Sequence, residues 1–364
     1  MNIVSRCGLM VATVLAAFGS GQALAQQLPA HLANDPVAKA LGAKIINAAI
    51  KEGAVHWYGG NTTRDFLKKK RKEFEKRFGI KINATTGSLR KMTQRVRTEY
   101  AVKKPIADAI AFNSQYMSEL HGINLLEKWR PPGKELANID PEVFVDEPKG
   151  YWWPAGLSAQ ALNINTDMVK KKDYPKSYWD LVNPKWKGKI VIRDPRSAGG
   201  GAWQMLHIYT HPDLGMKYIK ELKRVVDPFI LHGSTDQGRD AVLLGRFPIG
   251  FNGRGDVVRD LPKGAPIAFH VPKEGLAFTP LSMAVLKDSK RPNAAKVLLT
   301  WFYSSVSNLQ MWSETSRPIS HPAIKLSVPE RSVTRYPRMK PIPMKILGKP
   351  NFFFKEMEKV FGIR

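Results

Sequence analysis

Short segments of hydroxyl, amide and glycine residues are the parts of this chain best suited to bind a small polar ligand. Four such segments lie at residues 61–63, 86–88, 197–201 and 234–235. Each follows an apolar run and precedes a helical pattern, so each would place free backbone N–H groups at a helix start. Helix starts attract anions, because these N–H groups carry the positive end of the helix dipole. Any one of these segments can be explained as an ordinary helix cap. Because two of them lie in each half of the chain, together they predict a ligand-binding cleft between the halves.

Three arginines stand beside predicted strand ends: Arg193, Arg196 and Arg254. A guanidinium in such a place can hold a carboxylate or phosphate through two hydrogen bonds. The alternative is that they are ordinary surface arginines of a basic protein. Together with the helix starts, they favour an anionic ligand.

Patterns typical of catalysis or metal binding are weak. The chain has no Gly-x-Ser-x-Gly elbow, no His-Glu-x-x-His helix and no phosphate-binding loop. His207 and His211 have helical spacing but no evident third ligand, so a zinc site is not expected. The single cysteine, Cys7, precedes an N-terminal apolar run, so the rest of the chain has no thiol nucleophile. We therefore expect no enzymatic activity, no metal and no cofactor.

Strand and helix patterns alternate along the chain. Apolar runs at 54–58, 80–84 and 107–112 end in polar turns, and helical patterns over 64–77 and 89–102 follow the first two. Such alternation predicts α/β units with a largely parallel sheet.

The second half repeats this theme, with predicted strands at 188–194 and 247–251. The stretch at 151–165 is rich in aromatic residues and broken by proline, and we interpret it as a crossover between two lobes. Residues 281–286 predict a strand that returns to the first lobe.

The N-terminus has the pattern of a cleaved secretory signal. Arg6 precedes an apolar run that is too short to span a bilayer, and Ala23 and Ala25 supply the small residues of a cleavage site. The short run disfavours the alternative of a membrane anchor. We expect residues 1–25 to be removed and the mature chain to act outside the cytoplasm.

The net charge of +26 is spread along the whole chain, which is typical of a solvated surface. No RNA- or DNA-binding motif accompanies the basic residues, so no nucleic-acid partner is expected.

Several segments, in the same order, resemble the periplasmic solute-binding proteins of ABC transporters. They are residues 53–60, 74–82, 87–88, 107–108, 163–166, 179–190, 194–195, 199–200, 284–287 and 291–296. The run Trp-Asp-Leu-Val-Asn-Pro-Lys-Trp-Lys-Gly-Lys at 179–189 is the most specific. The chain is most similar to the family that includes ferric-iron, thiamine, polyamine and phosphonate binders.

The resemblance implies an α/β fold of the two-lobed, type II periplasmic binding protein class, each lobe a mixed sheet flanked by helices. Lobe 1 would comprise residues 26–155 and 282–364, and lobe 2 residues 156–281, with hinges near 154–158 and 278–282. A monomer in the periplasm would close on a small polar solute and deliver it to a membrane permease with its ATPase. The positions that match the family, with Asn252 near a later strand end, give the expected ligand-binding residues: Tyr58, Asn61, Thr62, Gly87, Ser88, Asn113, Ser114, Ser197, Gly199, Gly200, Ser234, Thr235 and Asn252.

Two rival functions stay open at this point. Ferric-iron members of the family carry adjacent tyrosines shortly before an Arg-Pro element. Here Arg317 and Pro318 follow Trp-Ser-Glu-Thr-Ser, and no tyrosine pair occurs anywhere in the chain, which disfavours iron. A secreted α/β hydrolase is the rival from another class, and the lack of a nucleophile counts against it.

Overall fold

The computed structural model describes residues 27–140, 150–196, 199–233, 235–253, 257, 260–315, 317–328, 332, 335–347 and 350–362. The expected signal peptide lies outside these residues. In the described part of the chain, no helix is both long and apolar enough to cross a membrane.

The described strands form a single mixed sheet in the order β2-β1-β3-β9-β4-β7-β5-β6, with β8 paired to β4. Parallel pairs join β1 to β2 and β3, and β5 to β6 and β7, whereas β3–β9, β9–β4 and β4–β7 are antiparallel. The α/β fold expected from the sequence is therefore confirmed. The strands are β1 (Ala54–Gly59), β2 (Lys81–Thr86), β3 (Ala109–Asn113), β4 (Trp153–Asn165), β5 (Ile190–Arg193), β6 (Phe229–Leu231), β7 (Ile249–Gly253), β8 (Ile267–His270) and β9 (Ala277–Val285).

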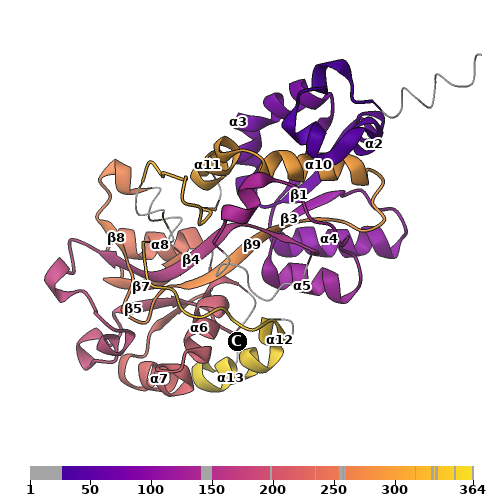
Figure 1. Cartoon of the computed structure of the whole chain (residues 1–364). Helices are drawn as coiled ribbons and strands as arrows, with labels where there is room; N and C mark the ends of the chain where they lie inside the picture. Colours follow the sequence, from indigo (N-terminus) through magenta and orange to yellow (C-terminus); the bar gives the residue numbers. More distant parts are fainter. Residues whose placement is uncertain are drawn as a thin grey trace, which may run out of the picture.

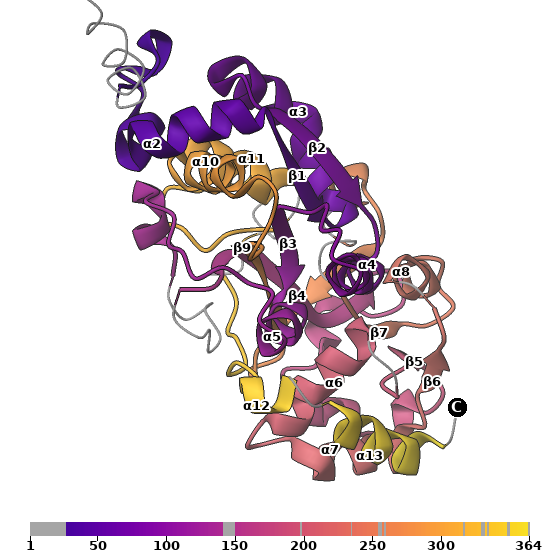
Figure 2. The same ribbon diagram turned by 90° about the vertical axis from the view of Figure 1, so that its right-hand side faces the viewer.

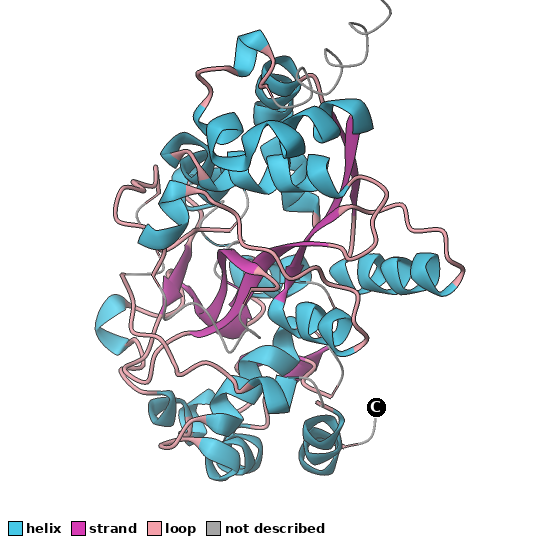
Figure 3. Ribbon diagram, turned by 45° about the vertical axis from the view of Figure 1, so that its right-hand side comes forward, coloured by secondary structure: helices cyan, strands magenta, loops and turns pink. Residues whose placement is uncertain are grey.

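Helices cover both faces of this sheet (Figures 1 and 3). In Figure 2, α2, α3, α10 and α11 gather at one end of the molecule, and α6, α7 and α13 at the other. The helices are α2 (Pro36–Glu52), α3 (Asn61–Phe78), α4 (Leu89–Ala101), α5 (Ser114–Gly122), α6 (Gly200–Thr210), α7 (Gly215–Glu221), α8 (Thr235–Leu243), α10 (Pro292–Tyr303), α11 (Val306–Thr315), α12 (Met344–Leu347) and α13 (Asn351–Phe361).

The long strands β4 and β9 connect the two halves of the sheet. Their pairing is regular from Leu157 to Gln160 but shifts register between Pro154 and Leu157. Gly156 lies in this irregular stretch with φ of 121°, and a Cβ there would stand 2.5 Å from the carbonyl oxygen of Arg317. Only glycine meets both demands, so the backbone bends at the place expected for a hinge.

Three apolar clusters show how the sheet is covered. The α10 cluster includes Met283 and Val285 of β9 and packs under α2, α3, α10 and α11. The α5 cluster includes Ala284 of β9 and packs under α4 and α5. The α6 cluster includes Ala277 of β9 and packs under α6, α7 and α13. Successive residues of a strand face opposite sides, so Ala284 of the α5 cluster faces away from its neighbours Met283 and Val285 of the α10 cluster, and in β4 Leu162 of the α6 cluster faces away from Ala161 of the α10 cluster. The α10 cluster therefore occupies one face of the sheet, and the α5 and α6 clusters occupy the other.

The C-terminal segment departs from the expected lobe assignment. Residues 282–364 were all expected in lobe 1, yet Met339, Ile342, Phe353, Met357 and Phe361 belong to the α6 cluster, with the strands of the second half. The apolar face of α13 packs against the apolar residues of the α6 cluster. The short α12 lies between α5 and α13, so this segment touches both halves (Figures 1 and 2).

Candidate functional site

A band of polar side chains interrupts the apolar face between the α5 and α6 clusters. Ser282 pairs with Phe112 of the α5 cluster, Ser158 pairs with Thr279, and Gln160 pairs with Ala277 of the α6 cluster. Paired residues share a face, so Ser158, Gln160 and Thr279 lie on the face of the α6 cluster, and Ser282 lies on the face of the α5 cluster. We call these four residues the polar band. A buried strand face normally carries apolar side chains, so polar side chains at these positions indicate a site for polar contacts.

The start of α6 reaches the polar band at the end of β5. A Cβ on Gly200 would clash with the guanidinium of Arg193 and would lie 2.7 Å from Nε2 of Gln160. A Cβ on Gly201 would likewise clash with the Arg193 backbone. The glycines therefore let a helix start, an arginine and a buried amide come together, as close backbone approach requires. Gly199, the N-cap residue of α6, adjoins them.

Helix starts of the first half stand at the ends of the parallel strands β1, β2 and β3. None of the N-cap residues of α3, α4, α5 and α6 bonds its helix through a side chain, whereas Asp35 accepts two backbone N–H bonds at the start of α2. The first turns of these four helices also carry no carboxylate. Their free N–H groups are not offset by acidic side chains, so these helix ends keep a positive potential.

The two sets of strand ends lie close enough to contact one small molecule. The last residue of β3, Asn113, pairs with Leu281, and the last residue of β7, Gly253, pairs with Gln160, which in turn pairs with Ala277. Leu281 lies four positions after Ala277 in β9, which is about 13 Å of extended chain. That span suits a metabolite of a few carbon atoms.

The residues expected to bind ligand occupy different surroundings. Gly87 and Ser88 precede α4, Asn113 precedes α5, and Ser114 begins it with its hydroxyl donated to the Pro280 carbonyl at 3.3 Å. Asn61 and Thr62 lie in the first turn of α3, and Thr235 begins α8, so the helices start earlier than the sequence indicated. Ser197, Ser234 and the neighbouring Arg254 lie outside the described residues.

Tyr58 and Asn252, two of the expected residues, have buried side chains. Tyr58 donates to Glu99 at 2.7 Å beneath α4, and Arg95 also bonds this carboxylate. Burial, with the neighbouring carboxylate, raises the pKa of Tyr58 to about 12. The amide of Asn252 lies against Gly238 of α8, on the face opposite Gln160. Both side chains point away from the polar band.

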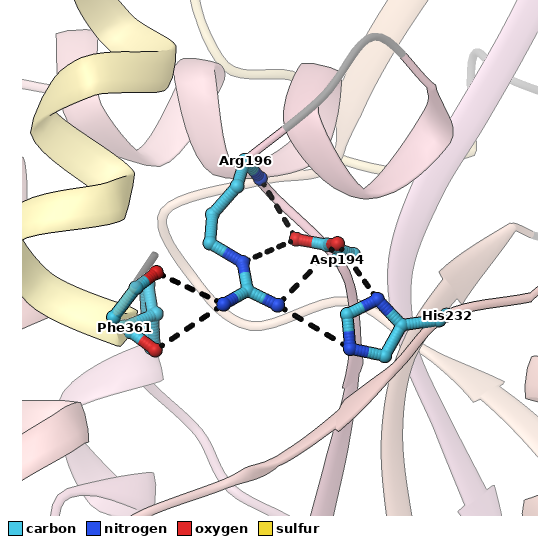
Figure 4. A network of polar contacts seen from close by, with 5 residues as sticks. Asp194, Arg196, His232 and Phe361 are labelled. Atoms are coloured by element: carbon cyan, nitrogen blue, oxygen red, sulfur yellow. Dashed lines mark hydrogen bonds and ion pairs between the residues drawn. The ribbon is translucent and has the colours of Figure 1, made fainter. Parts of the chain in front are cut away.

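Arg196 is used inside the protein (Figure 4). Its guanidinium bonds Asp194 at 2.9 Å and the Gly362 carbonyl beyond α13 at 2.9 Å, and it contacts the ring of His232. His232 in turn contacts the other oxygen of Asp194 at 3.0 Å. Burial alone would raise the pKa of Asp194, but the hydrogen bonds and charge of Arg196 outweigh it and lower that pKa. Arg196 is thus a structural residue that joins β5 to the C-terminal helix.

Comparison with known proteins agrees with this architecture. The family model of bacterial extracellular solute-binding proteins matches residues 104–338, more than half of the chain. The chain belongs to this family. The resemblance inferred from the sequence is therefore confirmed. The members of this family are solute-binding proteins.

Individual relatives in the family are distant. An uncharacterized Haemophilus influenzae protein is 24% identical over 53% of this chain, and the match spans only 54% of that protein. The spermidine/putrescine-binding periplasmic protein of Escherichia coli is 26% identical over 63% of this chain and 67% of its own length.

Solved structures show the same fold. The Trichodesmium protein in complex with iron and citrate has a TM-score of 0.69 and 21% identity, covering 86% of this chain and 100% of its own. The periplasmic binding protein AfuA of Actinobacillus pleuropneumoniae, with fructose-6-phosphate bound, has a TM-score of 0.67 and 18% identity, covering 85% of this chain and 99% of its own. At such identities the likeness establishes the fold of the chain and leaves its ligand open.

Metal-binding groups do not gather in the described residues of this family member. They contain no cluster of three or more His, Cys, Asp or Glu side chains that could hold an ion. Tyr58, Tyr178, Tyr218 and Tyr303 are buried, and burial raises the pKa of each, which opposes the phenolate form that hard cations bind. His207 is enclosed with Nε2 at 2.6 Å from the Phe278 carbonyl, and burial lowers its pKa to about 4.

The sequence analysis predicted none of the four residues of the polar band. Gln160 and Ser158 lie in the middle of β4, Thr279 and Ser282 in β9, and none of them follows a strand end. A regular strand that is apolar on both faces should contain no glutamine or serine inside it, so these interruptions were the available signal. Their convergence with Arg193 depended on the pairing of β4 with β9.

Proposed function

We propose that the chain is the substrate-binding component of an ABC importer. In the periplasm, as a monomer, it captures a small polar anion between the two halves of the sheet, without chemical conversion, and delivers it to a permease with its ATPase. One observation carries the anionic assignment: four helix starts at the strand ends have neither a side-chain cap nor a first-turn carboxylate. Anions satisfy such N–H groups, and cations do not.

The charges near these helix starts support the same assignment. Arg64 lies in the first turn of α3, and Arg90 and Lys91 lie in the first turn of α4. Cations at a helix N-terminus oppose the dipole and cost stability, which an anionic ligand would recover. Arg193 adds a guanidinium beside Gln160 at the start of α6. A polyamine site would instead need carboxylates to pair with its ammonium groups.

Closure of the two halves would bury this ligand. The bend at Gly156 and the register shift beside it lie in the strands that connect the halves, as a hinge requires. We propose lobe 1 and lobe 2 as expected from the sequence, with the segment from Met339 to α13 assigned to lobe 2. The proposed contact residues are those expected at the strand ends, with Arg193, Ser158, Gln160 and Thr279 added.

Ferric iron is the competing ligand, because the Trichodesmium structure of the same fold contains iron. The burial of the tyrosines and the lack of a described metal-ligand cluster weigh against it. Addition of ferric salt to the mature protein should give no phenolate charge-transfer band in the visible spectrum. A strong band that saturates at one equivalent of ferric ion would show that the ligand is iron and not an organic anion or phosphate.

A thermal-shift and calorimetry panel tests the anion directly. The panel contains malate, citrate, glycerol 3-phosphate, inorganic phosphate, spermidine and putrescine. A ligand that binds only the folded state raises its stability by about 2.7 kcal/mol at one hundred times Kd, a shift of a few degrees. We expect shifts from anions alone and a large loss of affinity in Arg193→Met. Tight binding of spermidine, with no binding of any anion, would show that the ligand is a cation. X-ray scattering that shows no compaction of the protein when ligand is bound would contradict closure of the two halves.

A further inference from the structure

The side-chain amide of Gln160 is buried without a partner at the candidate site. Gln160 is 8% exposed, its Oε1 has no hydrogen-bond partner, and no described residue bonds its Nε2. Two other buried amides of this half donate within the protein: Nε2 of Gln204 donates to the Ala161 carbonyl at 2.8 Å, and Nδ2 of Asn165 donates to the Val242 carbonyl at 2.8 Å. Unpaired buried amides destabilise a fold, so this one needs an explanation.

The surroundings of the Gln160 amide supply that explanation. The amide lies at the start of α6, with Nε2 2.7 Å from the position that a Cβ on Gly200 would occupy, and the Arg193 guanidinium is beside the same position. Asn163 also has an unpaired amide, but it is completely enclosed and faces the opposite side of the sheet, toward α8. Gln160 is the amide that a ligand held by α6 and Arg193 would meet.

The hydrogen-bonding capacity of the three groups defines the ligand. Arg193 and the helix N–H groups only donate, so they match anionic oxygens. The amide of Gln160 both donates and accepts, so one of its ends matches the anion and the other needs a donor on the ligand. If the positions of Oε1 and Nε2 are exchanged, the end of the amide that donates and the end that accepts are exchanged too. The ligand must still offer both an acceptor and a donor.

The donor on the ligand should be a hydroxyl group. An ammonium group in this place would stand next to Arg193 and to helix starts without first-turn carboxylates, which repels a cation. A hydroxyl donates without adding positive charge. The hydroxyl groups of Ser158 and Thr279, on the same face as Gln160, could bond further ligand hydroxyls.

We propose that Gln160 makes this protein selective for hydroxylated anions, in which a hydroxyl group neighbours a carboxylate or a phosphate. The inference rests on the anion-binding function proposed above and narrows its substrate class. Gln160 distinguishes such solutes from their deoxy analogues because only the hydroxyl satisfies its second hydrogen-bonding end.

Matched ligand pairs test the selectivity by isothermal titration calorimetry on the mature full-length chain. The pairs are malate with succinate, for carboxylates, and glycerol 3-phosphate with propyl phosphate, for phosphates. In at least one pair, the hydroxylated member should bind ten times more tightly or better. The pair that shows the preference identifies the anionic group.

Three variants separate selectivity from anion binding. Gln160→Met keeps the length of the side chain and should bring the hydroxylated-to-deoxy ratio to within threefold of one, with the deoxy anion bound as before and the melting temperature unchanged or higher. Arg193→Met should weaken both members of a pair. Gln94→Met, at an exposed glutamine of α4, is the matched control and should behave as the wild type.

Equal binding of both members to the wild type, or a ratio that survives in Gln160→Met, would overturn the role of Gln160 while leaving anion binding intact. Failure of all four anions to bind, with spermidine bound instead, would overturn the anion-binding function and this inference together.

Discussion

The polar band and the Arg196 cluster, made of Asp194, Arg196 and His232, differ in how their polar groups are satisfied. In the Arg196 cluster, a nearly buried guanidinium finds a carboxylate, an imidazole and the carbonyls at the end of α13. In the polar band, the Gln160 amide has no partner in the described chain. A buried group satisfied by the protein stabilises the fold, whereas one left unsatisfied points to a ligand.

Arg196→Met should give the largest loss of stability. It leaves the buried carboxylate of Asp194 without its main partner and breaks the contact with the C-terminus of α13, so we expect about 3 kcal/mol less stability. Urea unfolding followed by circular dichroism at pH 7 measures this. Arg193→Met is the paired variant, and its smaller stability loss should accompany the loss of anion affinity. Equal losses in the two variants would erase the distinction between the regions.

Acid should remove the advantage of wild type over Arg196→Met. The pKa of Asp194 is lowered in the folded state, so its stabilising effect is complete above the unfolded pKa of about 4 and disappears as the pH falls through the folded value. Burial lowers the pKa of His207 to about 4, which costs stability as the pH falls below about 6.5, but equally in both proteins. The difference between their melting temperatures should therefore narrow as the pH falls toward and below about pH 4, because the buried Asp194 carboxyl of the variant, without Arg196, also protonates more readily. A constant difference down to pH 2 would exclude the ion pair as its cause.

Removal of a hydroxyl group should reduce stability where the hydroxyl is hydrogen-bonded within the protein, and should reduce ligand affinity where it is not. Ser177 accepts from the backbone N–H of Trp179 and bonds Glu274, so Ser177→Ala should cost about 1 kcal/mol and leave ligand affinity unchanged. Thr279→Val in the polar band should change stability by less than about 0.5 kcal/mol and weaken the bound anion about tenfold. Denaturation and calorimetry on both variants measure the contrast. A stability loss in Thr279→Val larger than that in Ser177→Ala would show that the polar band is structural.

Exposed charges should have the smallest effect. Arg64, Lys68, Lys72 and Lys76 follow one another at four-residue spacing on α3, where like charges repel. Lys72→Glu places a carboxylate between two lysines and should raise stability by about 0.5 kcal/mol, an effect that 1 M salt suppresses. Lys72→Gln serves as the neutral control. Thermal melts at low and high salt measure it, and an increase that persists in high salt would indicate a cause other than charge.

Much of the element order could be predicted from the sequence. The apolar runs at 54–58 and 188–194 became β1 and β5, and the helical patterns at 64–77 and 89–102 became α3 and α4, because local periodicity reports which face is buried. The exact helix starts were misplaced by a few residues, since polar residues such as Thr62 fit both a cap and a first turn. The place of α13 was also missed, because an amphipathic pattern does not name the surface that it covers.

The candidate site was predicted only as a set of strand ends. The sequence located Gly199 and Gly200 beside an arginine, and the structure places Gly200 against Gln160. The sequence could not separate Arg193 from Arg196, because both lie near the end of the same predicted strand and have the same side chain. The difference arises from Asp194 and α13, which hold the Arg196 guanidinium, whereas the Arg193 guanidinium lies beside Gly200 at the start of α6.

The sequence by itself determined the alternation of strands and helices, the family and the polar character of the strand ends, because these depend on neighbouring residues and their spacing. Only the tertiary structure decided which polar groups the protein satisfies for itself. That outcome depends on the antiparallel pairing of β4 with β9 and on the docking of α13, which bring together residues more than one hundred positions apart. Hydrogen bonds act over about 3 Å, so the partners of a buried group follow from the folded arrangement and not from its place in the chain.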